Sequence, residues 1–133
     1  MIENVEWIGH ASFRIVDDMI IYVDPWKIDD DDQADLILIT HPHFDHCSIE
    51  DVKKLMKSDT EIVTVIEAAE KLKEIDKNGN IRVVDPGDKI TAKGFDIEAV
   101  RAYNKKKDFH PKKNNWAGFV IDVFGERLYF AGD

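Results

Sequence analysis

Short runs of apolar and β-branched residues dominate the N-terminal part of the chain. The polar pair Asp17-Asp18 separates the second run from the third and predicts a hairpin turn. Pro25 ends the third run, because proline cannot donate to a strand ladder. A fourth run, Leu36–Ile39, is apolar at every position, as expected of a strand that is covered on both faces. The predicted strands cover residues 5–8, 12–16, 19–23 and 36–39.

Helical spacing follows this fourth run. Ser48 with Asp51 three residues later approximates a capping box, and Val52 and Leu55 recur at helical spacing. A helix is therefore predicted to begin near Ile49. The alternation continues with a strand at 60–66, a helix at 68–75 and a strand at 81–84.

Alternating strands are predicted for the rest of the chain, after the turn signal Asp85-Pro86-Gly87-Asp88. The predicted strands cover residues 89–92, 95–102, 116–123 and 127–131. Residues 103–115 are predicted to form a long loop between two of them, and a loop of that length in a compact domain is usually functional or mobile.

Length and composition predict one domain, residues 1–133, because a chain of 133 residues with 44% hydrophobic residues can bury one core. The net charge of -9 argues against a general nucleic-acid binder. No apolar run approaches the roughly 20 residues of a membrane span, and the N-terminus lacks a basic region followed by an apolar stretch. The single cysteine, Cys47, fits a reducing compartment. We expect a cytoplasmic protein that does not bind a membrane.

The candidate chemistry lies directly after the strand at 36–39. Four potential metal ligands, His41, His43, Asp45 and His46, fall within six residues. Such a loop can converge on one or two divalent ions, and its mixed nitrogen and oxygen donors suit Zn²⁺, with Mn²⁺ or Fe as alternatives. The alternative is that these histidines only cap a loop and a helix. The cluster favours a metal site with an open position for water.

The segment Thr40-His41-Pro42-His43-Phe44-Asp45-His46 resembles the H-x-H-x-D-H signature of the metallo-β-lactamase superfamily. Further segments are similar to the branch that contains ascorbate-6-phosphate lactonase and many metal-dependent hydrolases. They are Trp7-Ile8-Gly9-His10-Ala11-Ser12-Phe13, Tyr22-Val23-Asp24-Pro25 and Leu128-Tyr129-Phe130-Ala131-Gly132-Asp133. The resemblance implies an α/β (α+β) fold, a β-sandwich flanked by helices. Families of this fold usually exceed about 200 residues, so the chain is expected to be incomplete at its C-terminus.

The resemblance also implies roles for individual residues. His41 and His43 would hold a first metal together with His110, which lies in the long loop. Asp45 and His46 would hold a second metal. The family's bridging aspartate corresponds to Asp133, the last residue of this sequence. The family's final histidine ligand has no counterpart in this sequence. A solvent-exposed histidine among the loop's lysines is the alternative for His110.

Two further residues are candidates for the surroundings of the metal. By resemblance Asp24 would orient a metal-bound imidazole, because a carboxylate that accepts the outer N–H of such a ring fixes its orientation. Asp24 could equally cap a turn. His10 would line the site, or would be a structural histidine. Cys47 follows His46 directly, but the family pattern does not use it as a ligand.

These residues predict a metal-dependent hydrolase in which a metal-activated water attacks an ester, a lactone or a phosphoester. Asp45 would orient the water or accept its proton. Five lysines beside His110 could attract a small anionic substrate, although a solvated loop is the more ordinary interpretation. The alternative function is a non-catalytic metal-binding fragment or interaction module that lacks the second half of the site.

A missing second half would leave apolar surface uncovered. We therefore expect a homo-oligomer, or a partner that supplies the missing half of the site. The candidate residues for the exposed surface are the apolar ones on the last two predicted strands: Trp116, Phe119, Ile121, Leu128 and Phe130.

Overall fold

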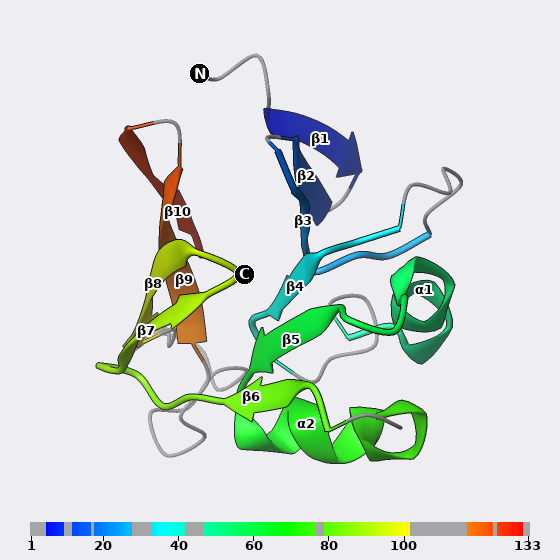
Figure 1. The fold of residues 1–133 in the computed structure, drawn as a ribbon. Coiled ribbons are helices and arrows are strands. Elements are labelled where there is room, and N and C mark those ends of the chain that lie inside the picture. The colour runs from blue at the N-terminus through cyan, green and yellow to red at the C-terminus, as the bar shows by residue number, and fades with distance from the viewer. Residues whose placement is uncertain are drawn as a thin grey trace.

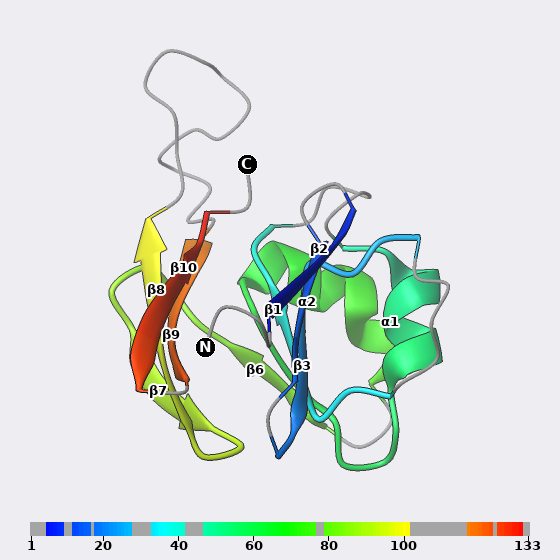
Figure 2. The ribbon, with the colours of Figure 1, turned by 90° about the horizontal axis from the view of Figure 1, so that it is seen from above.

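The computed structural model describes residues 5–9, 12–16, 18–27, 33–41, 47–76, 79–101, 117–123 and 125–131. These residues form three layers, with a small sheet packed on one face of a larger sheet and the helices on the other face (Figure 2). This is the helix-flanked sandwich that the sequence predicts.

The larger sheet has six strands in sequence order. They are β1 (Val5–Gly9), β2 (Ser12–Val16), β3 (Ile20–Val23), β4 (Leu36–Ile39), β5 (Glu61–Thr64) and β6 (Ile81–Val83). The first three strands pair antiparallel, whereas β3, β4, β5 and β6 run parallel to one another. All four residues of β4 are buried, because helices cover one face of this strand and the second sheet covers the other (Figure 1).

Two short helices lie in the crossovers from β4 to β5 and from β5 to β6. They are α1 (Ile49–Leu55) and α2 (Ile66–Leu72), which continues into the 3-10 helix η2 (Lys73–Ile75). The Asp51 amide donates to Ser48 Oγ over 3.4 Å, so Ser48 is the predicted N-cap of α1. The second helix begins earlier than predicted, because β5 ends at Thr64 and Val65 is its N-cap. Among the described helices, none has the length and apolarity needed to span a membrane.

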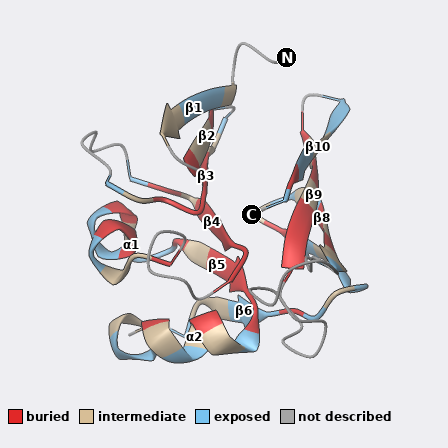
Figure 3. Cartoon of the chain, turned by 180° about the vertical axis from the view of Figure 1, so that it is seen from behind, coloured by how far each residue is buried: buried red, intermediate tan, exposed pale blue. Residues whose placement is uncertain are grey.

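The smaller sheet is entirely antiparallel, in the order β10-β9-β8-β7. Its strands are β7 (Lys89–Ala92), β8 (Phe95–Arg101), β9 (Ala117–Val123) and β10 (Glu126–Phe130). Buried residues concentrate on the middle strands of both sheets (Figure 3). The Phe13 and Phe130 rings, 5.2 Å apart between centroids, join the two sheets.

The expected exposed apolar surface on the last two strands is wrong. Phe119 and Ile121 are 0% exposed, Phe130 is 8% exposed, and Leu128 is half-buried against the core. The physical reason is strand alternation: these side chains point toward the larger sheet, which covers them. Trp116 lies outside the described residues.

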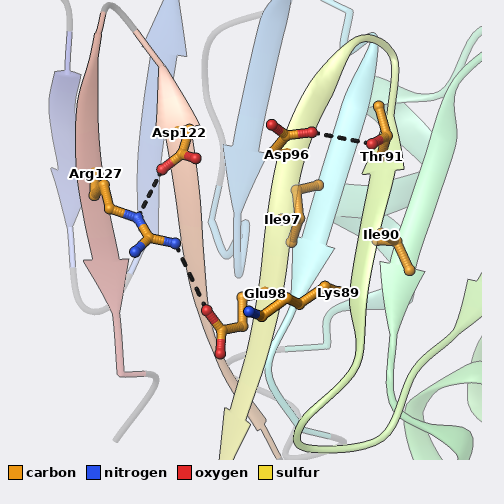
Figure 4. Close-up of a pocket in the computed structure, with 8 residues that line it drawn as sticks. All are labelled: Lys89, Ile90, Thr91, Asp96, Ile97, Glu98, Asp122 and Arg127. Carbon is orange, nitrogen blue, oxygen red and sulfur yellow. Dashed lines mark hydrogen bonds and ion pairs between the residues drawn. The ribbon is translucent and has the colours of Figure 1, made fainter.

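The opposite face of the smaller sheet is polar and surrounds a shallow hollow of ≈ 340 Å³ (Figure 4). Arg127 pairs across three strands there, with its Nε 2.9 Å from Asp122 Oδ1 and its Nη2 3.6 Å from Glu98 Oε1. Charged side chains that neutralise one another are typical of a sheet face in contact with water.

Candidate metal centre

The candidate site begins where β3 and β4 end. These strands are parallel neighbours, with Val23 opposite Leu38, so their carboxyl ends lie at the same edge of the sheet. Asp24 follows β3 directly, and Thr40 and His41 follow β4. The three side chains are almost completely buried, at 0%, 0% and 1% exposure. Residues 16 positions apart in sequence thus form one polar cluster inside the protein.

Thr40 binds both carboxylate oxygens of Asp24. Its backbone N–H donates to Oδ1 over 2.8 Å, and its hydroxyl donates to Oδ2 over 2.7 Å. Buried carboxylates are costly unless hydrogen bonds replace the lost water, and these two bonds provide that compensation. Asp24 therefore ties the end of β3 to the residue that precedes His41.

The backbone of Asp24 is itself held in an uncommon conformation. Its φ of 45° lies in the left-handed region, which non-glycine residues adopt rarely. The Asp24 amide donates to Leu38 O over 2.9 Å, and Ser12 Oγ donates to Asp24 O over 2.5 Å. Two neighbouring strands thus fix the turn that directs the carboxylate toward Thr40.

His41 joins this cluster through Nδ1, which lies 2.8 Å from Thr40 Oγ1. The other ring nitrogen, Nε2, is also buried. An imidazole that is oriented through one nitrogen by a hydrogen-bonded carboxylate network is the usual arrangement of a metal ligand. The His41 ring is therefore oriented as a ligand that would offer Nε2 to a divalent cation.

A second contact fixes the loop after Asp24. Asp51, in the first turn of α1, accepts a hydrogen bond from the Lys27 amide over 2.8 Å. Lys27 also has a positive φ, of 55°, and its ammonium lies 4.6 Å from the centroid of the Trp26 ring. The segment from Asp24 to Lys27 is thus anchored to β4 at Asp24 and to α1 at Lys27.

Cys47 is buried beside this cluster and is 1% exposed. Burial raises the pKa of its thiol from 9.0 to about 11; Lys71 opposes this shift and Asp24 adds to it. The thiol is therefore protonated at neutral pH.

The structure brings together two of the residues that the sequence singled out, His41 and Asp24. The other candidates lie outside the described residues: His10, His43, Asp45, His46, His110 and Asp133. Within the described ranges, no group of three or more His, Cys, Asp or Glu side chains could hold a metal. The larger ligand set therefore remains a prediction.

Sequence reasoning missed two residues of the cluster, Thr40 and Ser12. Both stand inside the segments that carry the family resemblance, but only the acidic and imidazole side chains were given roles. Their hydroxyl groups acquire a role through Asp24, which is distant from both in the sequence and which only the fold brings to them. Thr40 also contacts its sequence neighbour His41.

Comparison with known proteins gives this cluster its context. A family model described as a β-lactamase superfamily domain matches residues 4–133. The chain belongs to the metallo-β-lactamase superfamily. The two-sheet architecture and the position of His41 after a buried parallel strand agree with this membership.

Individual members of the superfamily cover nearly all of this chain. It is 34% identical to a protein of Thermoplasma acidophilum named a metal-dependent hydrolase, over 98% of this chain and 61% of the relative. A solved structure from Parabacteroides distasonis, also named as a candidate metal-dependent hydrolase, is 35% identical with a TM-score of 0.85. That similarity covers 97% of this chain and 60% of the other.

More distant structural neighbours include a di-iron β-hydroxylase from Streptomyces venezuelae, which is 17% identical with a TM-score of 0.76. The match covers 96% of this chain and 29% of the hydroxylase, and at this identity it shows the fold alone. The chain spans about three fifths of the length of its nearer relatives.

Proposed function

We propose that this chain carries the first part of a metal-dependent hydrolase site, in which His41 is a ligand of the metal. The observation that carries the proposal is the buried Asp24–Thr40–His41 network at the carboxyl ends of β3 and β4. Membership of the metallo-β-lactamase superfamily and relatives named metal-dependent hydrolases support it.

The proposed ligands come from the histidine segment and from two positions further along the chain. His41 and His43 would hold a first metal with His110, whereas Asp45 and His46 would hold a second metal, and Asp133 would be a ligand of both. We favour Zn²⁺ because of the mixed imidazole and carboxylate donors, with Mn²⁺ or Fe as alternatives. The fold of a di-iron protein is similar, so iron is a realistic competitor for the site.

A divalent cation bound there supplies a Lewis acid that makes water more acidic and polarises a carbonyl or phosphoryl oxygen. The protein's own part is positional. Asp24 and Thr40 fix the direction of the His41 ring, and burial keeps bulk water away from this network. Asp45 would orient a water molecule and accept its proton.

For the substrate we propose a small molecule with an ester, a lactone or a phosphoester bond. The lysines at positions 105, 106, 107, 112 and 113 flank His110 in the sequence and favour an anionic substrate, although the chain as a whole has a net charge of -9.

Metal analysis combined with hydrolysis assays tests this proposal. We expect the purified chain to retain a divalent transition metal, and the double variant with His41→Ala and His43→Ala to lose most of it. Asp96→Asn, on the polar face of the smaller sheet, is the control and should retain the metal. Equal metal content in the double variant and the parent would show that the first-site assignment is wrong.

Hydrolysis of a generic phosphodiester and of a generic lactone then separates the two functions considered. Turnover that the double variant loses supports the enzyme. Bound metal without turnover of either substrate favours the alternative, a non-catalytic metal-binding module.

We also propose that the chain associates, either with itself or with a partner that supplies further ligands. The support is no longer the apolar face of β9 and β10, which the larger sheet covers. Two other observations support association. Among the described strands, β1 and β10 are edge strands of their sheets, and Trp7 on β1 is 65% exposed. Light scattering on the isolated chain tests this proposal: a stable monomer at high concentration would contradict self-association and would remove the reason to invoke a partner.

A further inference from the structure

We propose that Thr40 is a positioning residue that selects the tautomer of His41, so that the ring offers its Nε2 lone pair to a metal. This inference rests on the proposed function for its purpose, but the proton position that it assigns exists in the metal-free protein. The carrying observation is the chain of contacts Asp24 Oδ2, Thr40 Oγ1 and His41 Nδ1, at 2.7 and 2.8 Å.

The first step concerns the carboxylate. An ionised carboxylate only accepts hydrogen bonds. Oδ1 of Asp24 receives the Thr40 amide proton, so the hydrogen bond at Oδ2 must use the hydroxyl proton of Thr40. A threonine hydroxyl has a single hydrogen, and this hydrogen is used in the hydrogen bond to Asp24.

The second step concerns the ring. With its hydrogen directed to Asp24, Thr40 Oγ1 can only accept at its contact with His41. The 2.8 Å contact therefore requires a proton on Nδ1. A neutral imidazole has one proton, so Nε2 then carries the lone pair that a metal needs.

The third step concerns water. Thr40 and Asp24 are 0% exposed and His41 is 1% exposed, so water cannot easily replace a missing partner in this network. Ser12 holds the Asp24 carbonyl and Leu38 holds its amide, which keeps the carboxylate in place. The protonation pattern is thus built into the fold before any metal arrives.

For the variant Asp24→Asn, this network predicts a change in the position of the His41 proton. The Thr40 amide still needs an acceptor, which places the asparagine oxygen at Oδ1 and its NH₂ group opposite the Thr40 hydroxyl. The amide then donates to Thr40 Oγ1, and the hydroxyl turns its hydrogen to Nδ1 of His41. The ring must move its proton to Nε2, so this isosteric change should invert the tautomer.

The test is ¹⁵N NMR of the imidazole nitrogens in the metal-free chain, at a pH where the rings are neutral. The His41 signals are assigned by their loss in His41→Gln. The parent and Thr40→Ser, which keeps a hydroxyl, should show the proton on Nδ1. Thr40→Val should lose this preference, and Asp24→Asn should show the proton on Nε2.

Thr64→Val is the matched control. Thr64 is 0% exposed, and its hydroxyl donates to Ile39 O over 2.9 Å, so this variant also removes a buried hydroxyl next to the end of β4. It should leave the proton of His41 on Nδ1. A parent ring with its proton on Nε2, or a Thr64→Val spectrum that changes as much as that of Thr40→Val, would overturn the proposal. If Thr40→Val fails to fold, the opposite tautomers expected for Thr40→Ser and Asp24→Asn still decide it.

Zn²⁺ titration gives a second readout. Loss of a group that orients a metal ligand typically weakens metal binding about 10–100-fold, which we expect for Thr40→Val and Asp24→Asn but not for Thr40→Ser or Thr64→Val. A parent chain with the expected tautomer and no affinity for Zn²⁺, Mn²⁺ or Fe²⁺ would contradict the proposed function while leaving the tautomer assignment intact.

Discussion

Two carboxylates stand at opposite ends of the β3–β4 pair and perform the same task for the sheet. At the carboxyl end, Asp24 accepts the backbone N–H of Thr40 on the neighbouring chain segment. At the amino end, Asp35 accepts the backbone N–H of Ile20 over 2.8 Å. Each carboxylate thus joins the two parallel strands at the point where the ladder ends.

Their second partners differ. Asp35 binds the ammonium of Lys57, with Nζ 2.6 Å from Oδ1, and the two side chains are 17% and 37% exposed. The second oxygen of Asp24 receives the hydroxyl of Thr40 instead, in a fully buried position beside His41. The partly exposed Asp35–Lys57 arrangement is sufficient to join the two strands. The buried arrangement has a larger desolvation cost, which is why we associate it with function.

The largest expected effect follows from removing the buried carboxylate. Asp24→Ala leaves the Thr40 amide and hydroxyl without their acceptor, and unsatisfied buried donors cost about 1–3 kcal/mol each. We expect urea denaturation to show a loss of roughly 2–5 kcal/mol in the free energy of unfolding. For Asp35→Ala, where water can reach the donors, we expect only about 1 kcal/mol. Equal losses would remove the distinction between the two ends.

The amino end should show the smaller and pH-dependent effect. Burial raises the pKa of Asp35, but hydrogen bonds from Lys57 and the Ile20 amide outweigh it and hold the pKa below 3.8. A carboxyl group with a lowered pKa stabilises the fold above its unfolded pKa, and this contribution is lost as the pH falls through the folded pKa. Asp35→Asn should therefore flatten the decline of stability below about pH 4.

Urea denaturation at a series of acidic pH values checks this expectation, with Asp96→Asn on the polar outer face as the control. Added salt should also weaken the Asp35 contribution, because the ion pair is partly exposed. An Asp35→Asn variant with the same acid dependence as the parent would contradict the role of the ion pair.

At neutral pH the smallest effect concerns Cys47. Its pKa of about 11 lies above that of an unfolded cysteine, so the folded state keeps a proton that the unfolded state loses above pH 9.0. Stability should be unaffected at pH 7 and should fall as the pH rises from about 9 to 11. In Cys47→Ala this alkaline decline should shrink.

Alkylation of the Cys47 thiol reports which end of the β3–β4 pair controls access to this residue. At pH 8 the native thiol should react with iodoacetamide about a hundredfold more slowly than an exposed cysteine, because its thiolate is that much rarer. Asp24→Ala should accelerate the reaction by loosening the site end, whereas Asp35→Ala should change it little. Acceleration by Asp35→Ala but not by Asp24→Ala would contradict this expectation, because it would show that opening at the amino end controls access to the Cys47 thiol.

The order of elements and the location of the chemistry were predictable from the sequence. Leu36–Ile39 is apolar at every position, which indicates a strand covered on both faces, and Ser48 indicates where α1 begins. His41 stands directly after that strand, so its position at a strand end needed only local pattern. The roles of His43, Asp45, His46, His110, Asp133 and His10 stay predictions.

Tertiary structure decided the matters that depend on residues far apart in sequence. Which face of β9 and β10 is covered was decided by the larger sheet, whose Phe13 meets Phe130 more than a hundred positions away. Thr40 acquired its role because parallel pairing of β3 and β4 brings it to Asp24. Periodicity reports which side chains share a face of one strand, but the partner that covers that face is chosen by packing between strands.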